Sequence, residues 1–313
     1  MSLPKADAKG LSPKRVVLGT ALWGWGVDKH EAFQILDHFM ESGGTVVDVA
    51  TNYPINKVAS DYGLALEYIS DWIKSRQHNG LQVILKLGAL DNLGSNQFDL
   101  SRDRIARIVD EADRKLGKSL FCISVHWDNR DQSLDDYAGI EETAKELQEL
   151  SASGFEIGLS GIKNPAAYKK CINLCPNDLW IQVKENLLTH QARDSYEQVF
   201  PDAKYLAYGL NMGGLKIDEN RPESSKQLRN ITYPTWLVDS IRRFLTENDL
   251  YPEVRTVSDL TLFHAFCNRR LSGVILGPRT KAQLREALGF WDCLNKVMPE
   301  QSSYELECRI FGV

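Results

Sequence analysis

The stretch from residue 82 to residue 127 contains three segments: QVILKL at 82–87, DRIARIVDEADRKLG at 103–117 and LFCISVHW at 120–127. The first and third are short and rich in Val, Ile and Phe, which is typical of buried β-strands. The middle segment repeats its apolar residues at helical spacing. A strand, a helix and a strand in this order predict a parallel pair of strands, because the helix returns the chain to the end of the sheet where it started.

The same alternation runs through the whole chain. Helical patterns, such as those at 29–42 and 139–154, separate eight candidate strands at 15–21, 45–50, 82–87, 120–127, 156–161, 179–184, 204–209 and 272–276. Eight strands without a break favour a closed barrel over an open sheet. The sequence therefore predicts an α/β fold, a single-domain (β/α)8 TIM barrel over residues 15–313, after a flexible N-terminal segment at residues 1–14.

One connection departs from the regular pattern. Residues 211–234 read NMGGLKIDENRPESSKQLRNITYP, which is polar and rich in Gly and Pro. Long loops in compact domains are commonly functional or disordered. Because this loop follows the seventh candidate strand, we expect it to lie over the active-site face of the barrel.

Composition excludes several classes of partner. Lys plus Arg is 37 and Asp plus Glu is 42, so the net charge is 37 − 42 = −5, which does not indicate binding to nucleic acid or to an anionic membrane. The chain has neither a secretory signal pattern nor an apolar run long enough to span a bilayer. Its six cysteines form no CxxC pair, so we expect reduced thiols and a cytoplasmic location.

Polar residues interrupt or follow three consecutive apolar strands. Asp48 and Tyr53 lie in TVVDVATNY, Lys86 in VILKL and His126 in ISVHW. In a barrel the carboxyl ends of these strands converge, so the four side chains can meet. A nearby ammonium favours the phenolate of a tyrosine, a carboxylate keeps that ammonium charged, and a histidine can orient a substrate oxygen. The set suits protonation of a carbonyl oxygen as a hydride reaches its carbon.

These residues resemble the catalytic tetrad of the aldo-keto reductase family, in which the tyrosine follows the aspartate by five positions, as 53 − 48 = 5 does here. The resemblance extends from LGTALWGWG to GVILGPRTKAQLREAL. It implies that Tyr53 is the general acid and base, that Lys86 and Asp48 adjust its pKa, and that His126 orients the carbonyl.

The resemblance also implies a nicotinamide site. Gly19 and Thr20 match the first strand's approach to the cofactor, Ser160 and Gln182 match the contacts to the carboxamide, and Tyr208 matches the ring that stacks on the nicotinamide. Arg279 and Gln283, in GPRTKAQL, match the segment that binds the adenosine phosphate. An arginine at the start of a helix suits the 2′-phosphate, so the expected cofactor is NADP(H). There is no GxGxxG after the first strand, so a Rossmann site is not supported.

The substrate is less well defined by the sequence. Trp23, Trp25 and Trp127 are candidate pocket walls, and aromatic side chains with polar neighbours suit a sugar as well as an aryl carbonyl. Three positions depart from the family pattern: Pro54 and Ala287 stand where Gly and Asn are usual, and Gly161 replaces an Asn after the carboxamide serine.

Two other functions fit a barrel. A non-catalytic member of the same family would keep the cofactor and act as a redox-sensing or regulatory subunit. A metal-dependent hydrolase would need histidine and carboxylate ligands at several strand ends. The chain has six histidines but no HxH, and His126 is the only one within a candidate strand, so the sequence predicts no metal site.

Overall fold

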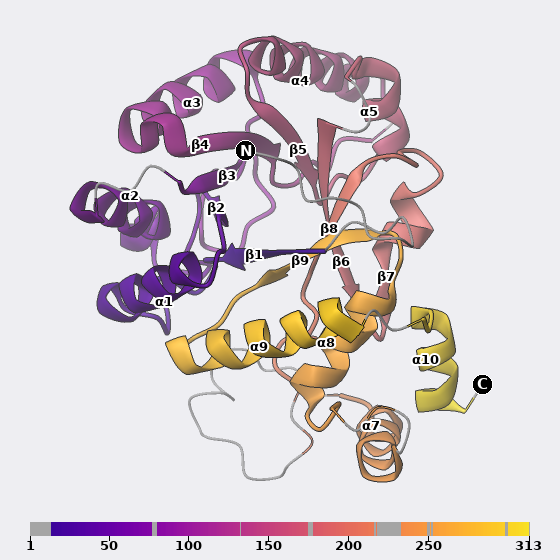
Figure 1. Ribbon diagram of the computed structural model, residues 1–313. Helices are drawn as coiled ribbons and strands as arrows, with labels where there is room; N and C mark the ends of the chain where they lie inside the picture. Colours follow the sequence, from indigo (N-terminus) through magenta and orange to yellow (C-terminus); the bar gives the residue numbers. More distant parts are fainter. Residues whose placement is uncertain are drawn as a thin grey trace.

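Eight parallel strands close into a barrel at the centre of the molecule, and helices surround them (Figure 1). Hydrogen bonding runs in order from β1 to β6, continues through β8 and β9, and returns to β1. The computed structural model therefore confirms the predicted single-domain (β/α)8 TIM barrel. The barrel strands are β1 (Arg15–Gly19), β2 (Val46–Ala50), β3 (Gln82–Leu87), β4 (Leu120–Val125), β5 (Glu156–Ser160), β6 (Leu179–Asn186), β8 (Lys204–Tyr208) and β9 (Leu271–Leu276).

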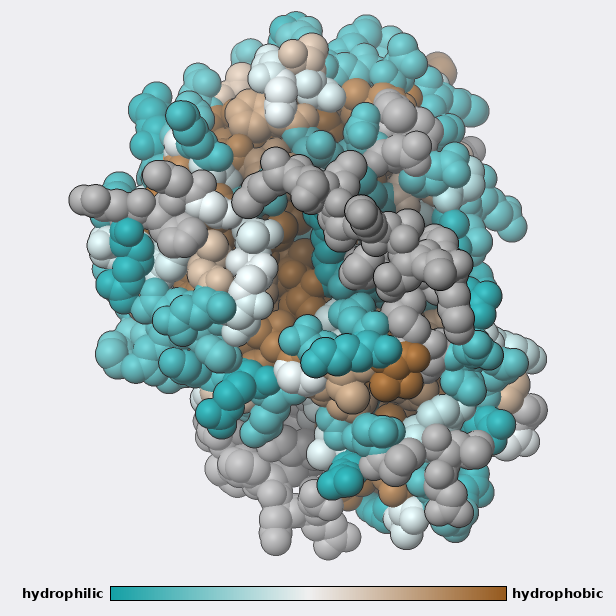
Figure 2. Space-filling view, in the orientation of Figure 1, coloured by the Kyte–Doolittle hydropathy of each residue, from teal (hydrophilic) through white to brown (hydrophobic). Residues whose placement is uncertain are grey.

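The helices cover the outside of the barrel with their apolar faces inward. In the first of them the side chain of Asp28 accepts a hydrogen bond from the N–H of Glu31, and Ala32, Ile35, Leu36 and Phe39 form its buried stripe. Figure 2 shows the result on one face, with hydrophilic side chains outside and hydrophobic ones toward the centre. The helices are α1 (Lys29–Glu41), α2 (Leu64–Arg76), α3 (Arg102–Leu116), α4 (Leu134–Ala152), α5 (Pro165–Cys171), α7 (Thr235–Glu247), α8 (Val257–Cys267), α9 (Lys281–Val297) and α10 (Ser303–Phe311).

The structure describes residues 14–76, 80–131, 133–174, 178–215, 217, 233–248, 251, 253–297 and 300–312. Most of the predicted N-terminal segment and of the 211–234 loop lies outside these ranges. Lys14, the last residue of that segment, donates through Nζ to the carbonyl oxygens of Ala265 and Phe266 at the end of α8. Within the described part, no helix is both long enough and apolar enough to cross a membrane.

The strand ends differ from the sequence prediction by up to two residues, and two differences bear on the site. β4 ends at Val125, so His126 follows the strand and does not lie within it. A two-residue strand, β7 (Thr189–His190), pairs antiparallel with the end of β6 and extends the sheet beyond the barrel. So short a strand has no alternating pattern that could reveal it.

The inside of the barrel has an apolar layer and a polar layer. Six buried residues from different strands pack together inside it, namely Val17, Val46, Ile84, Cys122, Trp180 and Leu206. Side chains alternate along a strand, so Asp48, Lys86 and Gln182, each two residues after a member of this layer, share its inward face. The polar layer therefore lies toward the carboxyl ends of the strands, which is where barrel enzymes have their sites.

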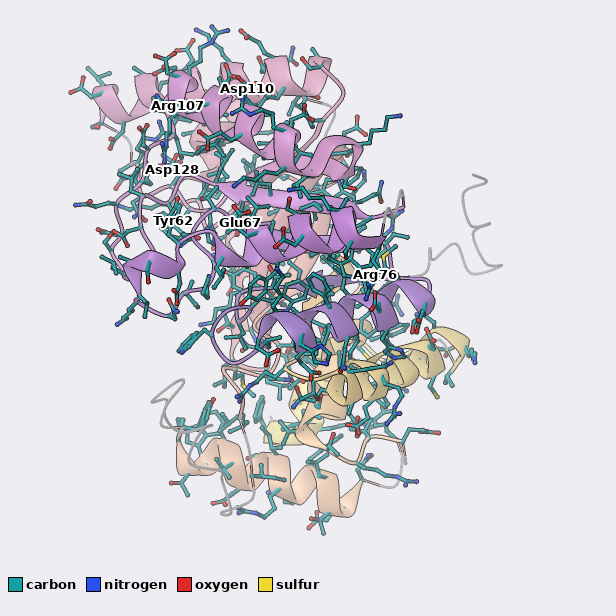
Figure 3. All side chains as sticks on the ribbon, turned by 90° about the vertical axis from the view of Figure 1, so that its left-hand side faces the viewer. Tyr62, Glu67, Arg76, Arg107, Asp110 and Asp128 are labelled. Carbon is teal, nitrogen blue, oxygen red and sulfur yellow. The ribbon has the colours of Figure 1, made fainter. Side chains whose placement is uncertain are left out.

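The loops that follow the strands and the ends of the helices lie at opposite ends of the barrel. Figure 3 places Tyr62 and Asp128, from loops that follow β2 and β4, toward one end, and Arg76, the last residue of α2, toward the other. The end that carries Tyr62 and Asp128 is therefore the end toward which Asp48, Lys86 and His126 are directed.

Candidate active site

Four side chains meet at the carboxyl end of the barrel, where Asp48, Tyr53 and Lys86 are buried and His126 is partly exposed. Lys86 Nζ lies 2.7 Å from Asp48 Oδ2 and 2.8 Å from Tyr53 Oη. The rings of Tyr53 and His126 meet edge to face, with their centroids 5.6 Å apart. The structure thus brings together all four residues that the sequence analysis selected for catalysis.

Strand register positions these side chains. Ala50 of β2 pairs with Lys86 of β3, and the N–H of Thr51 then donates to the Lys86 carbonyl oxygen over 2.9 Å. The N–H of His126 donates in the same way to the carbonyl oxygen of Leu87. Backbone hydrogen bonds therefore fix both Lys86 and its neighbours, and the geometry does not depend on side-chain contacts alone.

Gln182 joins the group from the opposite wall of the barrel. Its Nε2 donates to Asp48 Oδ1 over 2.7 Å, so both oxygens of the Asp48 carboxylate are occupied, one by Lys86 and one by Gln182. The sequence analysis assigned Gln182 to the cofactor only. The sequence alone does not show that β2 and β6 lie on opposite sides of the barrel. It also does not show that Asp48 and Gln182 lie at the same height inside it.

The electrostatics of the pair favour a charged lysine and a neutral tyrosine. Burial alone would lower the pKa of Lys86, but the carboxylate of Asp48 and the contact with Tyr53 outweigh it, and the pKa is raised. Burial also raises the pKa of Tyr53, and the opposing effect of Lys86 does not cancel it. The ammonium of Lys86 lowers the pKa of Tyr53 as expected, but burial raises this pKa by more.

His126 is neutral at physiological pH. Burial, and then repulsion by the Lys86 ammonium, lower the pKa of its imidazole well below 6.5. Its Nδ1 is enclosed and has no hydrogen-bond partner among the described residues. A neutral imidazole beside the Tyr53 ring can still take part in a hydrogen bond to a substrate oxygen.

The loop that follows Tyr53 is held by Asn92, which the sequence analysis did not select. Asn92 is buried, and its Nδ2 donates to the carbonyl oxygens of Val58 at 2.8 Å and Pro54 at 3.2 Å. The N–H of Lys57 donates back to the Asn92 carbonyl oxygen. Asn92 lies in the polar segment DNLGSN, where its type and position resemble those of an ordinary loop residue.

The predicted carboxamide contacts lie side by side. Ser160 at the end of β5 pairs in register with Gln182 of β6, and both are buried. The enclosed Oε1 of Gln182 has no partner among the described residues, so an acceptor is available for an amide N–H. The residues present therefore fit a nicotinamide carboxamide at this point.

The other residues assigned to the nicotinamide lie around the same end of the barrel. Thr20 Oγ1 donates to the carbonyl oxygen of Asp48 over 2.9 Å, and Gly19 pairs with Asp48 in register. A Cβ at Gly19 would lie 2.8 Å from Ile275, so only glycine leaves β1 this close to β9. Tyr208 ends β8 and is partly exposed.

The glycine at position 161 has a packing reason. Its φ is +54°, and a Cβ there would lie 3.1 Å from the carbonyl oxygen of His126 and 3.2 Å from Trp127 Cβ. The departure from the family pattern therefore allows the loop after β5 to approach the loop that carries His126.

The start of α9 already holds a carboxylate. Glu31 Oε1 accepts a hydrogen bond from the N–H of Lys281 over 2.7 Å. Gln283 Oε1 accepts from the N–H of Arg279, while the Arg279 guanidinium lies near Gly26, where a Cβ would be 3.6 Å from Nη2. The predicted phosphate site thus has cationic groups and a competing anion, the carboxylate of Glu31. The sequence did not indicate that Glu31, which is far away along the chain, lies at this site.

The three tryptophans occupy different environments. Trp127 is partly exposed and lies beside His126, with ring centroids 4.5 Å apart, and Trp25 is also partly exposed. Trp23 is 1% exposed and belongs to the main core, which gives it a packing position and not the predicted pocket wall.

A cavity of about 390 Å³ lies beside Tyr208. Its other lining residues are mainly polar, namely Lys184, Leu188, Thr189, His190, Gln191, Asp194 and Ser195. The sequence analysis named none of these seven as site residues. Lys184 ends a candidate strand, and the other six come from the short segment around β7, which carries no clear strand or helix pattern.

Comparison with known proteins agrees with this geometry. The model of the aldo/keto reductase family matches residues 15–301. No curated protein sequence matches the chain. Among solved structures, the holo form of the aldo-keto reductase AKR11C1 from Bacillus halodurans is similar to this chain at 18% sequence identity, with a TM-score of 0.69 over 98% of this chain and 94% of that one. At that identity, the likeness shows a shared fold.

The Lys86–Asp48 pair predicts an asymmetry in stability. Asp48→Ala leaves the Lys86 ammonium buried without its counter-ion, so we expect it to lower the free energy of unfolding by about 3–5 kcal/mol. Lys86→Met should cost less, because methionine fills the space of the lysine stem and Asp48 keeps the hydrogen bond from Gln182. Urea denaturation of both variants measures the difference.

The exposed pair of Lys29 and Asp71 provides the control for this measurement, and Asp71→Ala should cost about 1 kcal/mol or less. A larger loss for Lys86→Met than for Asp48→Ala would contradict the assignment of Asp48 as the essential counter-ion.

Proposed function

Because the chain belongs to the aldo-keto reductase family, we propose that it is an NADP(H)-dependent oxidoreductase that reduces the carbonyl group of an aldehyde, ketone or sugar to an alcohol. The observation that carries this proposal is the contact of 2.8 Å between Lys86 Nζ and the hydroxyl of Tyr53 in a buried site. A tyrosine held against a lysine in this way can give up a proton without leaving an unpaired negative charge.

Each residue of the group has a distinct part in the reaction. The nicotinamide cofactor, when bound, supplies the hydride that reaches the carbonyl carbon. Tyr53 donates its hydroxyl proton to the carbonyl oxygen, and the Lys86 ammonium stabilises the phenolate that remains. Asp48 keeps Lys86 charged and directed at Tyr53. His126, neutral and next to Tyr53, orients the substrate oxygen, and Trp127 beside it borders the substrate.

The raised pKa of Tyr53 keeps its hydroxyl protonated at neutral pH. This is the form that can donate a proton to the oxygen of a carbonyl substrate.

The cofactor contacts follow from the placement of the residues. Ser160 and Gln182 would hold the carboxamide, Tyr208 would stack on the ring, and Gly19 and Thr20 would border it. Arg279 and Lys281 provide two cationic groups for the 2′-phosphate against the single carboxylate of Glu31. The balance supports NADP(H), with Gln283 ordering the loop through the N–H of Arg279.

The surroundings support a small polar substrate and a reducing compartment. Trp127 beside His126 and the partly exposed Trp25 are aromatic walls that suit a small carbonyl compound or a sugar. The five described cysteines are free thiols, which agrees with a cytoplasmic enzyme. The alternative, a regulatory subunit without turnover, would leave the enclosed Tyr53–Lys86 contact without a use.

Tyr53→Phe tests the proposed proton donor. The change removes one hydroxyl and little contact area, so we expect turnover to fall by about 10²–10⁴-fold while the cofactor binds as before. NADPH oxidation is measured with a panel of aldehydes, ketones and sugars, and cofactor binding by protein fluorescence. A variant that keeps more than about half of the wild-type kcat would show that Tyr53 is not the proton donor. If the wild-type protein binds NADPH but reduces no member of the panel, the regulatory alternative is favoured.

The pH dependence of reduction follows from two pKa directions. His126 stays neutral through the range around pH 6.5, because its pKa is lowered well below that value. Tyr53 stays protonated up to its raised pKa, above 10.0. We therefore expect kcat/KM for reduction to be level from roughly pH 6 to 9 and to fall only at higher pH.

Initial rates across this range, with activity after return to neutral pH as the control for denaturation, check the expectation. An inflection near pH 6.5 that is absent from His126→Gln would show that His126 titrates. A decline at neutral pH would contradict the raised pKa of Tyr53.

The start of α9 predicts opposite effects of two substitutions on the cofactor. Arg279→Ala removes a charge-assisted contact to the 2′-phosphate, worth about 1.5–3 kcal/mol, and should weaken NADPH about tenfold or more without changing NADH. Glu31→Gln keeps an acceptor for the N–H of Lys281 but removes the negative charge, and should strengthen NADPH by about two- to fivefold.

Fluorescence titration of both cofactors measures these effects. Glu286→Gln, on the same helix but away from its first turn, is the matched control and should change neither affinity. Equal losses of NADPH and NADH in Arg279→Ala would show that Arg279 does not recognise the phosphate.

A further inference from the structure

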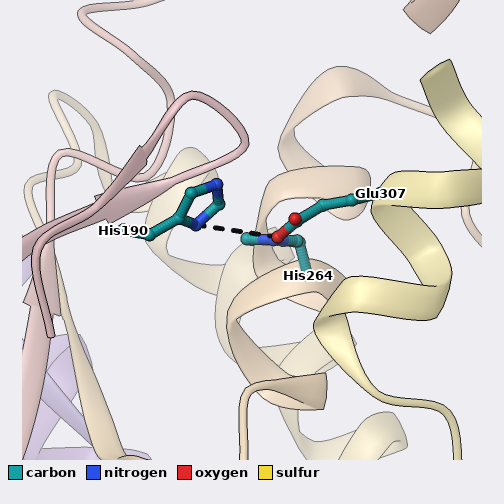
Figure 4. A group of neighbouring side chains, drawn as sticks. All are labelled: His190, His264 and Glu307. Atoms are coloured by element: carbon teal, nitrogen blue, oxygen red, sulfur yellow. Dashed lines mark hydrogen bonds and ion pairs between the residues drawn. The ribbon is translucent and has the colours of Figure 1, made fainter. Parts of the chain in front are cut away.

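Two histidines and two glutamates meet outside the active site. His190 of β7, His264 of α8 and Glu307 of α10 direct ring nitrogens and a carboxylate oxygen toward one another, all within 4.8 Å (Figure 4). Glu185, near the end of β6, places Oε1 3.5 Å from Nδ1 of His190. Nothing in the proposed reduction uses these four side chains.

Two carboxylates and two imidazoles are gathered in a largely enclosed place. Glu185 and His264 are 2% and 1% exposed, and Glu307 is 8% exposed. Within the described ranges, the ion pairs of both carboxylates are with histidines, which are cationic only when protonated. Buried carboxylates beside imidazoles are stabilised by a shared proton or by a cation.

The distances suit a tetrahedral metal ion. Nitrogen and oxygen ligands about 2.0–2.1 Å from zinc lie roughly 3.3 Å from one another. Nδ1 of His190 lies 3.7 Å from Glu307 Oε1, which is near this separation. His264 Nε2 lies 2.7 Å from Glu307 Oε1, so a metal would take the place of the proton that they share and widen this contact.

The neighbouring carboxylate of Glu185 is itself held in place by further hydrogen bonds. Asn268 Nδ2 donates to Glu185 Oε1 over 3.1 Å, and the N–H of Ala192 donates to Glu185 Oε2 over 3.1 Å. These contacts fix the orientation of the Glu185 carboxylate. His190 also lines the cavity beside Tyr208, which gives an ion a path from solvent.

We propose that His190, His264 and Glu307 bind one divalent metal ion of the zinc type, which holds α10 and β7 against α8. The nearby carboxylate of Glu185 adds a second negative charge that offsets the charge of a divalent cation. The three ligands belong to three separate elements, so the role of the ion is structural. The sequence offered no metal motif because these ligands come from three separate segments.

Metal binding by the full-length chain tests the proposal. The protein is treated with EDTA, freed of chelator and titrated with Zn²⁺ against a coloured chelator, and Co²⁺ is used as a spectroscopic probe. We expect one equivalent of Zn²⁺ per chain and a higher Tm with the ion. His264→Gln and Glu307→Gln should weaken binding at least about 100-fold. His30→Gln, at an exposed histidine of α1, should bind as the wild type does.

The two ligand variants keep polar groups that can hydrogen-bond to the remaining partner, and far-ultraviolet circular dichroism verifies that they fold. Absence of uptake by the wild-type protein would overturn the proposal. Equal uptake by both ligand variants, or a thiolate band with Co²⁺, which would place the ion on cysteines, would also overturn it. Binding without a rise in Tm would overturn the structural role.

Discussion

The buried ion pair between Lys86 and Asp48 is the constraint on which the active end of the barrel depends. The pair lies in the polar layer of the barrel interior, next to the apolar layer. Burying two charges costs free energy of desolvation, and this cost is offset because Lys86 and both oxygens of Asp48 have hydrogen-bond partners. Gln182 extends the pair across the barrel to β6, and Tyr53 extends it toward the end of the barrel. The interaction that fixes the interior is thus the same one that holds the hydroxyl of Tyr53, the proposed proton donor.

Much of the fold was readable from local patterns. The eight barrel strands alternate with amphipathic helices such as α1, and hydrophobic spacing reports this alternation without any knowledge of long-range contacts. The end of β4 was placed two residues too late, because ISVHW remains apolar and aromatic after the strand has ended at Val125. β7 was missed because two residues carry no periodicity.

The sequence predicted which residues form the candidate site, but it did not predict their burial or their electrostatic surroundings. The spacing of Asp48 and Tyr53 and the lysine within VILKL are visible in one dimension. The balance between burial and the charge of Lys86, which sets the pKa of Tyr53, exists only in the folded barrel. Glu31 at the start of α9 and Asn92 beneath the Tyr53 loop are likewise products of tertiary structure, because neither residue type is unusual where it stands in the sequence.

The seam between β1 and β9 has a consequence for how the molecule is made. β1 is synthesised first, yet its second neighbour in the sheet, β9, begins at Leu271. The hydrogen bonds that complete the seam join Lys281 to Glu31 and Trp291 to Lys14, across sequence separations of 250 and 277 residues. During translation β1 must therefore wait with one edge unpaired until nearly the whole chain has left the ribosome. The start of α9 reaches its place only at this last step, so a dinucleotide bound there would favour the closed ring over every partly built one.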